Sequence, residues 1–182
     1  TEINTELAEL SRKFGKNLTA ARKGFEVYVD DVATLDGMPA EYIERARASA
    51  EAAGKPGYRL SLFDGTSDQA QLSVHDAALR ERVYRAIRDV ATHDAFDNQP
   101  TIERLLALRA EKAEILGYKN FSDYVTADRM VKNGDAATAF IDDLAARTVP
   151  FVEQELEALR AFRKSVDGST DLQAWDYKYW QK

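Results

Sequence analysis

Hydrophobic residues recur along most of the chain at spacings of three and four, which place them on one face of a helix. Near the start of the chain this spacing predicts a helix that carries Leu7, Leu10, Phe14 and Leu18. The stretch GMPAEYIERARASAEAAG predicts a second helix, with Pro39 in its first turn and Gly54 just past its end.

One stretch follows a different period. In GYRLSLFDG the hydrophobic residues Tyr58, Leu60 and Leu62 alternate with polar ones before a turn, which is the pattern of a strand. A single strand needs a partner, so we expect a small hairpin near residues 58–64 whose second strand comes from elsewhere in the chain.

Helical periodicity returns after this stretch. It predicts one helix from residue 67 to about residue 93, and then a helix that Asn98 caps and Gly117 ends, with Pro100 in its first turn. The side chains of that second helix that we expect to face inward are Ile102, Leu105, Leu106, Ala113 and Leu116.

The last third of the chain predicts a short helix over residues 122–131 and a long one that Asp135 caps. Pro150 lies within the long helix and lacks a backbone N–H, so a bend or break is expected there. A polar turn at residues 167–171 leads to the aromatic stretch WDYKYWQK. The predicted fold class is therefore all-α, with at most a minor β-hairpin.

Composition narrows the classes of function. The 182 residues suit a single domain, and we expect one helical lobe over residues 1–182. The net charge of −6 argues against nucleic acid as a partner, and no apolar stretch approaches the length of a membrane span. The absence of cysteine excludes disulfides and thiolate catalysis, and it fits a cytoplasmic protein.

Residues able to perform chemistry are scarce. His75 and His93 are 18 residues apart on one predicted helix, hence about 27 Å apart at about 1.5 Å per residue, too far to share a metal. The set His93, Asp94 and Asp97 has metal-ligand side chains, but a solvated loop is the better interpretation. Arginines within residues 80–88 are expected to pair with Glu81 and Asp89 rather than to hold an anionic ligand. No catalytic residue and no metal ligand is predicted in this chain.

A resemblance emerges from motifs that occur in order along nearly the whole chain. Residues 79–124 contain Asp97-Asn98, the core Leu108-Arg109…Lys112-Ala113, and the closing Leu116-Gly117-Tyr118; near the end stands WDYKY, a Trp-Asp-x-x-Tyr segment. Together these resemble the M3 family of zinc oligopeptidases. The matching positions are interpreted as structural: a helix cap, a buried or ion-paired arginine, a helix stop and a packed aromatic corner, formed by Asn98, Arg109, Gly117, Trp175, Asp176 and Tyr179.

The resemblance implies a parent enzyme in which zinc-activated water attacks the peptide bonds of short peptides inside a deep, narrow channel. This chain lacks the His-Glu-x-x-His motif of the catalytic half, so it is interpreted as a non-catalytic part of the channel wall, with the zinc bound elsewhere in the parent. Residues 175–182 are then a connector toward the missing catalytic lobe. Trp175, Tyr177, Tyr179 and Trp180 are expected to form an apolar patch on the isolated chain, which the chain should cover by self-association, by crystal contacts or by folding the tail back. The alternative is that the tail packs within this lobe as part of its core.

Two alternatives stay open. The chain fits a self-standing helical interaction or scaffold domain with no enzymatic role, since no catalytic constellation is present. A weaker alternative is a binder of a metal or small molecule at His93, Asp94 and Asp97. Endopeptidase and dipeptidyl carboxypeptidase activity of the parent are not distinguished.

Overall fold

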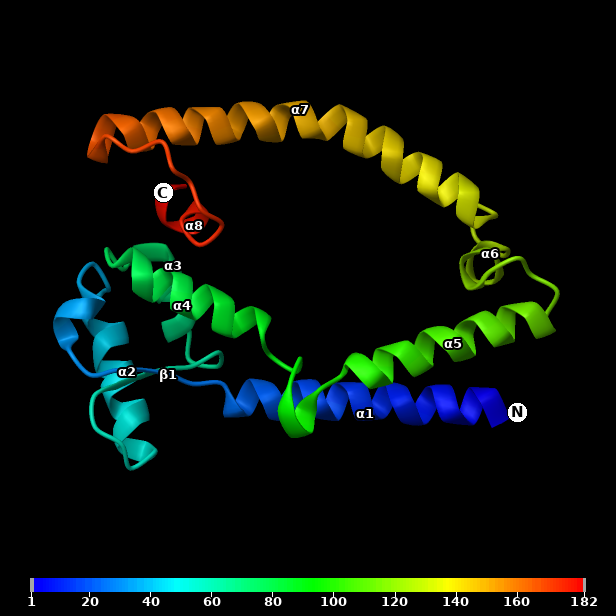
Figure 1. The fold of residues 1–182 in the computed structure, drawn as a ribbon, viewed down its shortest axis with the longest axis horizontal. Coiled ribbons are helices and arrows are strands. Elements are labelled where there is room, and N and C mark those ends of the chain that lie inside the picture. Colours follow the sequence, from blue (N-terminus) through cyan, green and yellow to red (C-terminus); the bar gives the residue numbers. More distant parts are fainter. Residues whose placement is uncertain (1, 182) are drawn as a thin grey trace. The chain divides into compact units, whose positions relative to one another are not determined.

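A computed structural model of the chain describes residues 2–181, which form eight α-helices, two short 3₁₀ helices and one two-stranded sheet (Figure 1). The predicted fold class, mainly helical with a minor hairpin, is confirmed. In chain order the elements are α1 (Glu2–Gly24), β1 (Val27–Val29), η1 (Val32–Leu35), α2 (Ala40–Ala52), β2 (Tyr58–Leu60), α3 (Thr66–Ser73), α4 (Ala77–Arg88), η2 (Asp94–Phe96), α5 (Gln99–Ile115), α6 (Phe121–Thr126), α7 (Gly134–Asp167) and α8 (Tyr177–Trp180).

The chain divides into two compact units. The first comprises Thr1–Lys16 and Asp97–Ala158, and the second comprises Asn17–Phe96 and Leu159–Lys182. Helices α1 and α7 each contribute residues to both units. The single helical lobe expected over residues 1–182 stays a prediction.

The second unit has its hydrophobic core around the hairpin. Strand β2 pairs antiparallel with β1, in a register that places Leu60 opposite Val27 and Tyr58 opposite Val29. The expected strand partner is therefore supplied by residues that precede η1. Helices α2, α3 and α4 cover the hairpin and complete a core that contains Phe25, Val27, Val29, Leu35, Met38, Ala46, Leu60, Ala70, Val74, Leu79 and Val83.

The predicted helix over residues 67–93 is wrong as a single helix. It is interrupted between α3 and α4, where the Asp76 carboxylate accepts hydrogen bonds from the backbone N–H groups of Ala78 and Leu79 and starts a new helix. The His75 N–H donates to the Asp36 carbonyl instead of continuing the first helix. The hydrogen bonds of the Asp76 side chain therefore interrupt the continuous helix that the spacing of hydrophobic residues predicts. The chain also leaves helix α4 at Arg88, five residues before His93.

In the first unit, the N-terminal part of α1 lies beside α5 (Figure 1). Arg104 of α5 donates two hydrogen bonds to the Glu6 carboxylate of α1, at 2.7 and 2.9 Å. Near the other end of α5, the Lys112 ammonium donates to the Asn4 side-chain oxygen at 2.8 Å. Polar contacts therefore join the two helices along the edges of their interface.

The inward face predicted for α5 is correct only in part. Leu105 and Ala113 are buried, whereas Ile102, Leu106 and Leu116 are exposed. Leu108, which the periodicity did not assign to the inward face, is 1% exposed. Helix α5 carries two neighbouring apolar stripes. The structure buries the one that contains Leu105 and Leu108, whereas only Ala113 is buried on the stripe of Ile102 and Leu106.

The last two predicted helices of the first unit exist with different boundaries. The helix expected over residues 122–131 is shorter and ends at Thr126. The cap of α7 is Asn133, whose side-chain oxygen accepts from the Ala136 N–H, so the prediction of Asp135 as the cap is wrong. No break occurs at Pro150, which lies inside a helix of 34 residues.

Candidate functional site

A buried carboxylate organises the C-terminal segment of the second unit. Asp176 accepts a hydrogen bond of 2.6 Å from Arg80 of α4 on one oxygen and one of 2.9 Å from Arg163 of α7 on the other. The side chains of Arg80 and Asp176 are only 3% and 4% exposed. Two arginines that are distant in sequence thereby hold the segment that precedes α8.

Local backbone geometry presents Asp176 to these arginines. The Asp176 N–H donates to the Gln173 carbonyl, and the Trp180 N–H donates to the Asp176 carbonyl to begin the short helix α8. Arg163 also donates to the backbone carbonyl of Asp171, and its Nε donates to Asp167 at 3.2 Å. Arg163 therefore fixes the turn at the end of α7 as well as the buried carboxylate.

Aromatic rings surround this ion-pair cluster. The Arg80 guanidinium lies 4.2 Å from the ring centre of Tyr179, which also meets the His75 ring edge-on at 6.1 Å. Trp180 contacts the rings of Tyr179 and Phe162, at 5.1 and 6.2 Å. A guanidinium over an aromatic face is attracted by the ring quadrupole, so the rings and the arginines stabilise one another.

The expected exposed patch of four aromatic rings is not observed. Trp175 packs against Tyr84 of α4 at 6.1 Å, and all four rings of residues 175–180 are half-buried within the second unit. The Lys178 ammonium adds a surface ion pair with Asp68 of α3, at 3.1 Å. The segment folds back because Asp176 gives it a buried attachment point, which the sequence pattern did not reveal.

Sequence reasoning missed both arginine partners of Asp176. The sequence pattern predicts that the arginines of residues 80–88 pair with Glu81 and Asp89, whereas Arg80 pairs with Asp176, and it does not single out Arg163. Asp176 and Arg80 are 96 residues apart, so no periodicity connects them. Within the arginine-rich residues 80–88, the ion pair predicted for Glu81 is confirmed, since its carboxylate accepts a hydrogen bond from Arg85 at 2.7 Å.

The three remaining motif positions lie in the first unit. Asn98 stands at the predicted N-cap position of α5, but its side chain does not cap the helix; its amide donates to the Phe14 carbonyl of α1 at 3.1 Å. Gly117 has φ of +77°, a left-handed conformation that suits glycine, and its N–H donates to the Glu114 carbonyl. Gly117 therefore follows the end of α5 as predicted.

Arg109 departs from its expected role. It is exposed rather than buried, and its guanidinium lies 5.3 Å from the ring centre of Phe121 of α6. It also borders an apolar hollow of about 300 Å³ between α1 and α5, which is lined by Ser11, Phe14, Ile102, Leu105, Leu106 and Arg109. The residue joins α5 to α6 through a cation–π contact.

The candidate metal ligands do not assemble a site. His93 lies 3.6 Å from Asp94 on the rim of a hollow of about 470 Å³, while Asp97 accepts a hydrogen bond from the Gln99 N–H at the start of α5. The His75 ring pairs with Asp36 at 3.0 Å. Across residues 2–181 no group of three or more His, Cys, Asp or Glu side chains is placed to hold a metal ion. The residues present therefore do not fit a zinc site, and no catalytic step follows from them.

The Glu6–Arg104 pair gives a testable pH dependence. The side-chain hydrogen bond from Arg104 lowers the pKa of Glu6 below its ordinary value of 4.5. Because the folded-state pKa is depressed, the pair contributes stability above the unfolded-state pKa and loses it as the pH falls through the folded-state value. We expect Arg104→Met to raise the pKa of Glu6 toward 4.5, as measured by NMR titration of the labelled carboxyl carbon.

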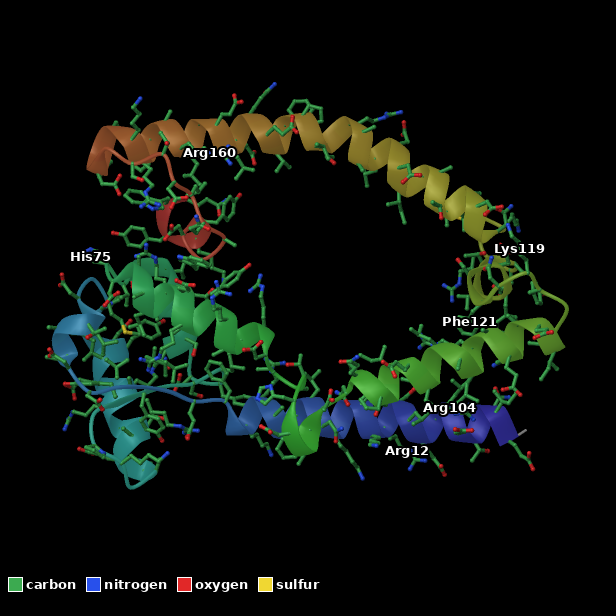
Figure 2. The ribbon with its side chains drawn as sticks, viewed as in Figure 1. Arg12, His75, Arg104, Lys119, Phe121 and Arg160 are labelled. Carbon is green, nitrogen blue, oxygen red and sulfur yellow. The ribbon has the colours of Figure 1, made fainter. Side chains whose placement is uncertain are left out.

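Arg12 offers a matched control for this titration. It projects from the same helix as Glu6, but its guanidinium donates to the Ala8 carbonyl of its own helix, whereas Arg104 reaches across from α5 (Figure 2). Arg12→Met should leave the pKa of Glu6 unchanged. Equal titration curves for the wild-type protein and the Arg104→Met variant would show that the pair does not form in solution.

Within the part of the chain that the structure describes, no helix is long and apolar enough to cross a membrane.

Comparison with known proteins gives one consistent result. The model of the family described as "Peptidase family M3" matches residues 70–182. Oligopeptidase A of Salmonella typhimurium is 37% identical over 186 residues, covering 100% of this chain and 27% of its own length. Dipeptidyl carboxypeptidase of Escherichia coli is 30% identical over 180 residues, covering 98% of this chain and 26% of its own length. The chain thus spans about a quarter of the length of these relatives.

Proposed function

The chain belongs to peptidase family M3, and from this premise we propose that it is a non-catalytic helical portion of a metallo-oligopeptidase that hydrolyses short peptides. The observation that carries the proposal is the match of the whole chain to oligopeptidase A. Oligopeptides are the substrates named by those relatives, and the relatives extend well beyond the matched region. The catalytic residues are proposed to lie in that further region of the polypeptide.

The zinc site is proposed for the whole enzyme, outside residues 1–182. The family resemblance implies a His-Glu-x-x-His helix that binds zinc, which would activate a water for attack on the peptide carbonyl. The residues of this chain are proposed to line a channel that admits unstructured peptides.

The location proposed for the enzyme is cytoplasmic. An Arabidopsis thaliana relative that is 30% identical over 190 residues is named "Probable cytosolic oligopeptidase A", and that name supports the proposal. Residues 175–182 are proposed to connect this portion to the catalytic part, with Asp176 as their anchor.

Expression of two proteins tests this function. The chain of residues 1–182 and the longest polypeptide that its gene encodes are purified, and each is assayed with a quenched fluorescent peptide and by elemental analysis. We expect turnover and one zinc per molecule only from the longer polypeptide, with the activity lost to a chelator and restored by zinc. Turnover by the 182-residue chain that survives repurification would overturn the assignment.

A self-standing interaction domain is the second candidate, favoured by the large apolar side chains that α7 exposes. A gene that ends at residue 182, together with binding of another protein through α7, would support that candidate over the peptidase portion.

A further inference from the structure

The middle of α7 is an amphipathic segment whose apolar side is exposed. Every residue from 138 to 155 is exposed, and among residues 2–181 no other helix or strand packs extensively along it. Large apolar side chains are nevertheless concentrated there, and Phe140 and Phe151 are each 66% exposed. A helix with this composition is stabilised mainly by burying its apolar side, rather than by the propensity of its residues.

The apolar residues occupy one broad side of the helix. Successive residues turn by about 100°, which places Phe140, Leu144 and Phe151 within about 40° of one another. Ile141 and Val152 extend the same side to a total of about 120°. We call these five residues the α7 apolar face.

The opposite side of α7 has the character of a solvated surface. Asp142 and Glu153 lie there, and Arg147, at the border of the apolar side, pairs with Asp143 at 3.0 Å along the helix. An α7 apolar face about 120° wide is broader than the seam of a two-stranded coiled coil and suits packing on the core of a globular domain.

Charge distinguishes between the surfaces that could cover this face. Helix α7 carries seven acidic residues against four basic ones, a net charge of −3. Helices that lie on anionic membranes are rich in Lys and Arg on their polar side, so a lipid surface is disfavoured. The two phenylalanines alone could bury roughly 150–250 Å² each, so the whole face reaches the few hundred Å² of a patch that is often an interaction surface.

We propose that the α7 apolar face docks on the part of the same polypeptide that lies outside residues 1–182. The relatives match this chain along its whole length, yet the match spans only 26–27% of their own length. The remaining length is ample for a globular domain with a core of its own. This inference rests on the proposed function, because it requires the chain to be part of an M3-length protein.

Cysteine labelling tests the docking, since the chain contains no cysteine. Phe151→Cys places a thiol on the α7 apolar face, and Glu153→Cys, two residues on, places one about 200° away around the helix. Both variants are made in the 182-residue chain and in the longer polypeptide. The rate of alkylation at each position is then followed by mass spectrometry of the peptide that contains it.

In the 182-residue chain we expect both thiols to react at similar rates. In the longer polypeptide, the thiol at position 151 should react at least about tenfold more slowly, since reaction then requires local opening of the interface. The thiol at position 153 should change by less than about twofold, because its side of the helix stays in water. Val152→Cys removes less volume than Phe151→Cys and repeats the test if the first variant does not fold.

Two results would overturn the inference. One is equal reaction at positions 151 and 153 in the longer polypeptide. The other is protection of position 151 in the 182-residue chain that increases with protein concentration, which would identify a second copy of the chain as the occupant.

Peptide cleavage and cysteine labelling, measured on the same longer polypeptide, test the proposed function and the docking independently. A longer polypeptide that cleaves peptides while position 151 reacts freely contradicts only the docking. A longer polypeptide that protects position 151 but cleaves no peptide contradicts only the peptidase assignment.

Discussion

Asp176→Asn is expected to lower the free energy of unfolding of the chain by about 3–5 kcal/mol. The substitution removes the negative charge between Arg80 and Arg163 while keeping the shape of the side chain. Arg80 is left as a buried, uncompensated cation, and this accounts for most of the loss. Urea-induced unfolding followed by circular dichroism measures the change.

The surface pair of the same segment provides the control. Asp68 accepts from Lys178 at 3.1 Å, but its side chain is 71% exposed. Asp68→Asn should therefore change the free energy of unfolding by less than about 1 kcal/mol. The double variant Arg80→Met/Asp176→Asn should be less destabilised than the sum of its single variants, because removing both charges leaves neither one unpaired. Similar losses for Asp68→Asn and Asp176→Asn would contradict the buried ion-pair cluster.

Leu108→Ala is expected to lower the free energy of unfolding of the first unit by about 2–5 kcal/mol. The side chain of Leu108 is fully enclosed at the packed face of α5, so its removal leaves a cavity. Leu106, on the same helix, is 58% exposed. Leu106→Ala should therefore change the free energy of unfolding by only about 0.5 kcal/mol.

This pair of variants compares the sequence pattern with the structure directly. The periodicity assigned Leu106 to the inward face and did not assign Leu108. Hydrogen exchange of the α5 amides, measured together with urea unfolding, reports whether the loss is local to the first unit. A larger loss for Leu106→Ala than for Leu108→Ala would show that α5 packs through its other stripe.

Local signals in the sequence were sufficient for most of the helical segments and for the ends of α2 and α5. Gly54 and Gly117 follow α2 and α5 in the left-handed conformation, because only a residue without Cβ adopts that backbone without strain. It was harder to predict where a capping side chain ends one helix and starts another. The Asp76 cap interrupted the expected helix, and the period of hydrophobic residues carries no information about which capping residue prevails.

The site depended more strongly on long-range packing. The sequence motif singled out Asp176 and Tyr179, but it did not identify Arg80 and Arg163 as their partners. Nor did it distinguish a terminal segment that folds back from one that stays exposed. The difference lies in the buried attachment of Asp176, which needs residues from α4 and α7 at once.

The sequence alone determined that this protein is mainly helical, where helices α2 and α5 end, and that it resembles the M3 peptidases. Each of these follows from residues close together along the chain or from motifs in a fixed order. Only the tertiary structure decided which stripe of α5 is buried, which cations neutralise Asp176, and which face of α7 is left uncovered. Those outcomes depend on residues that are far apart in sequence and meet only when burial of apolar surface offsets the entropy of ordering the chain.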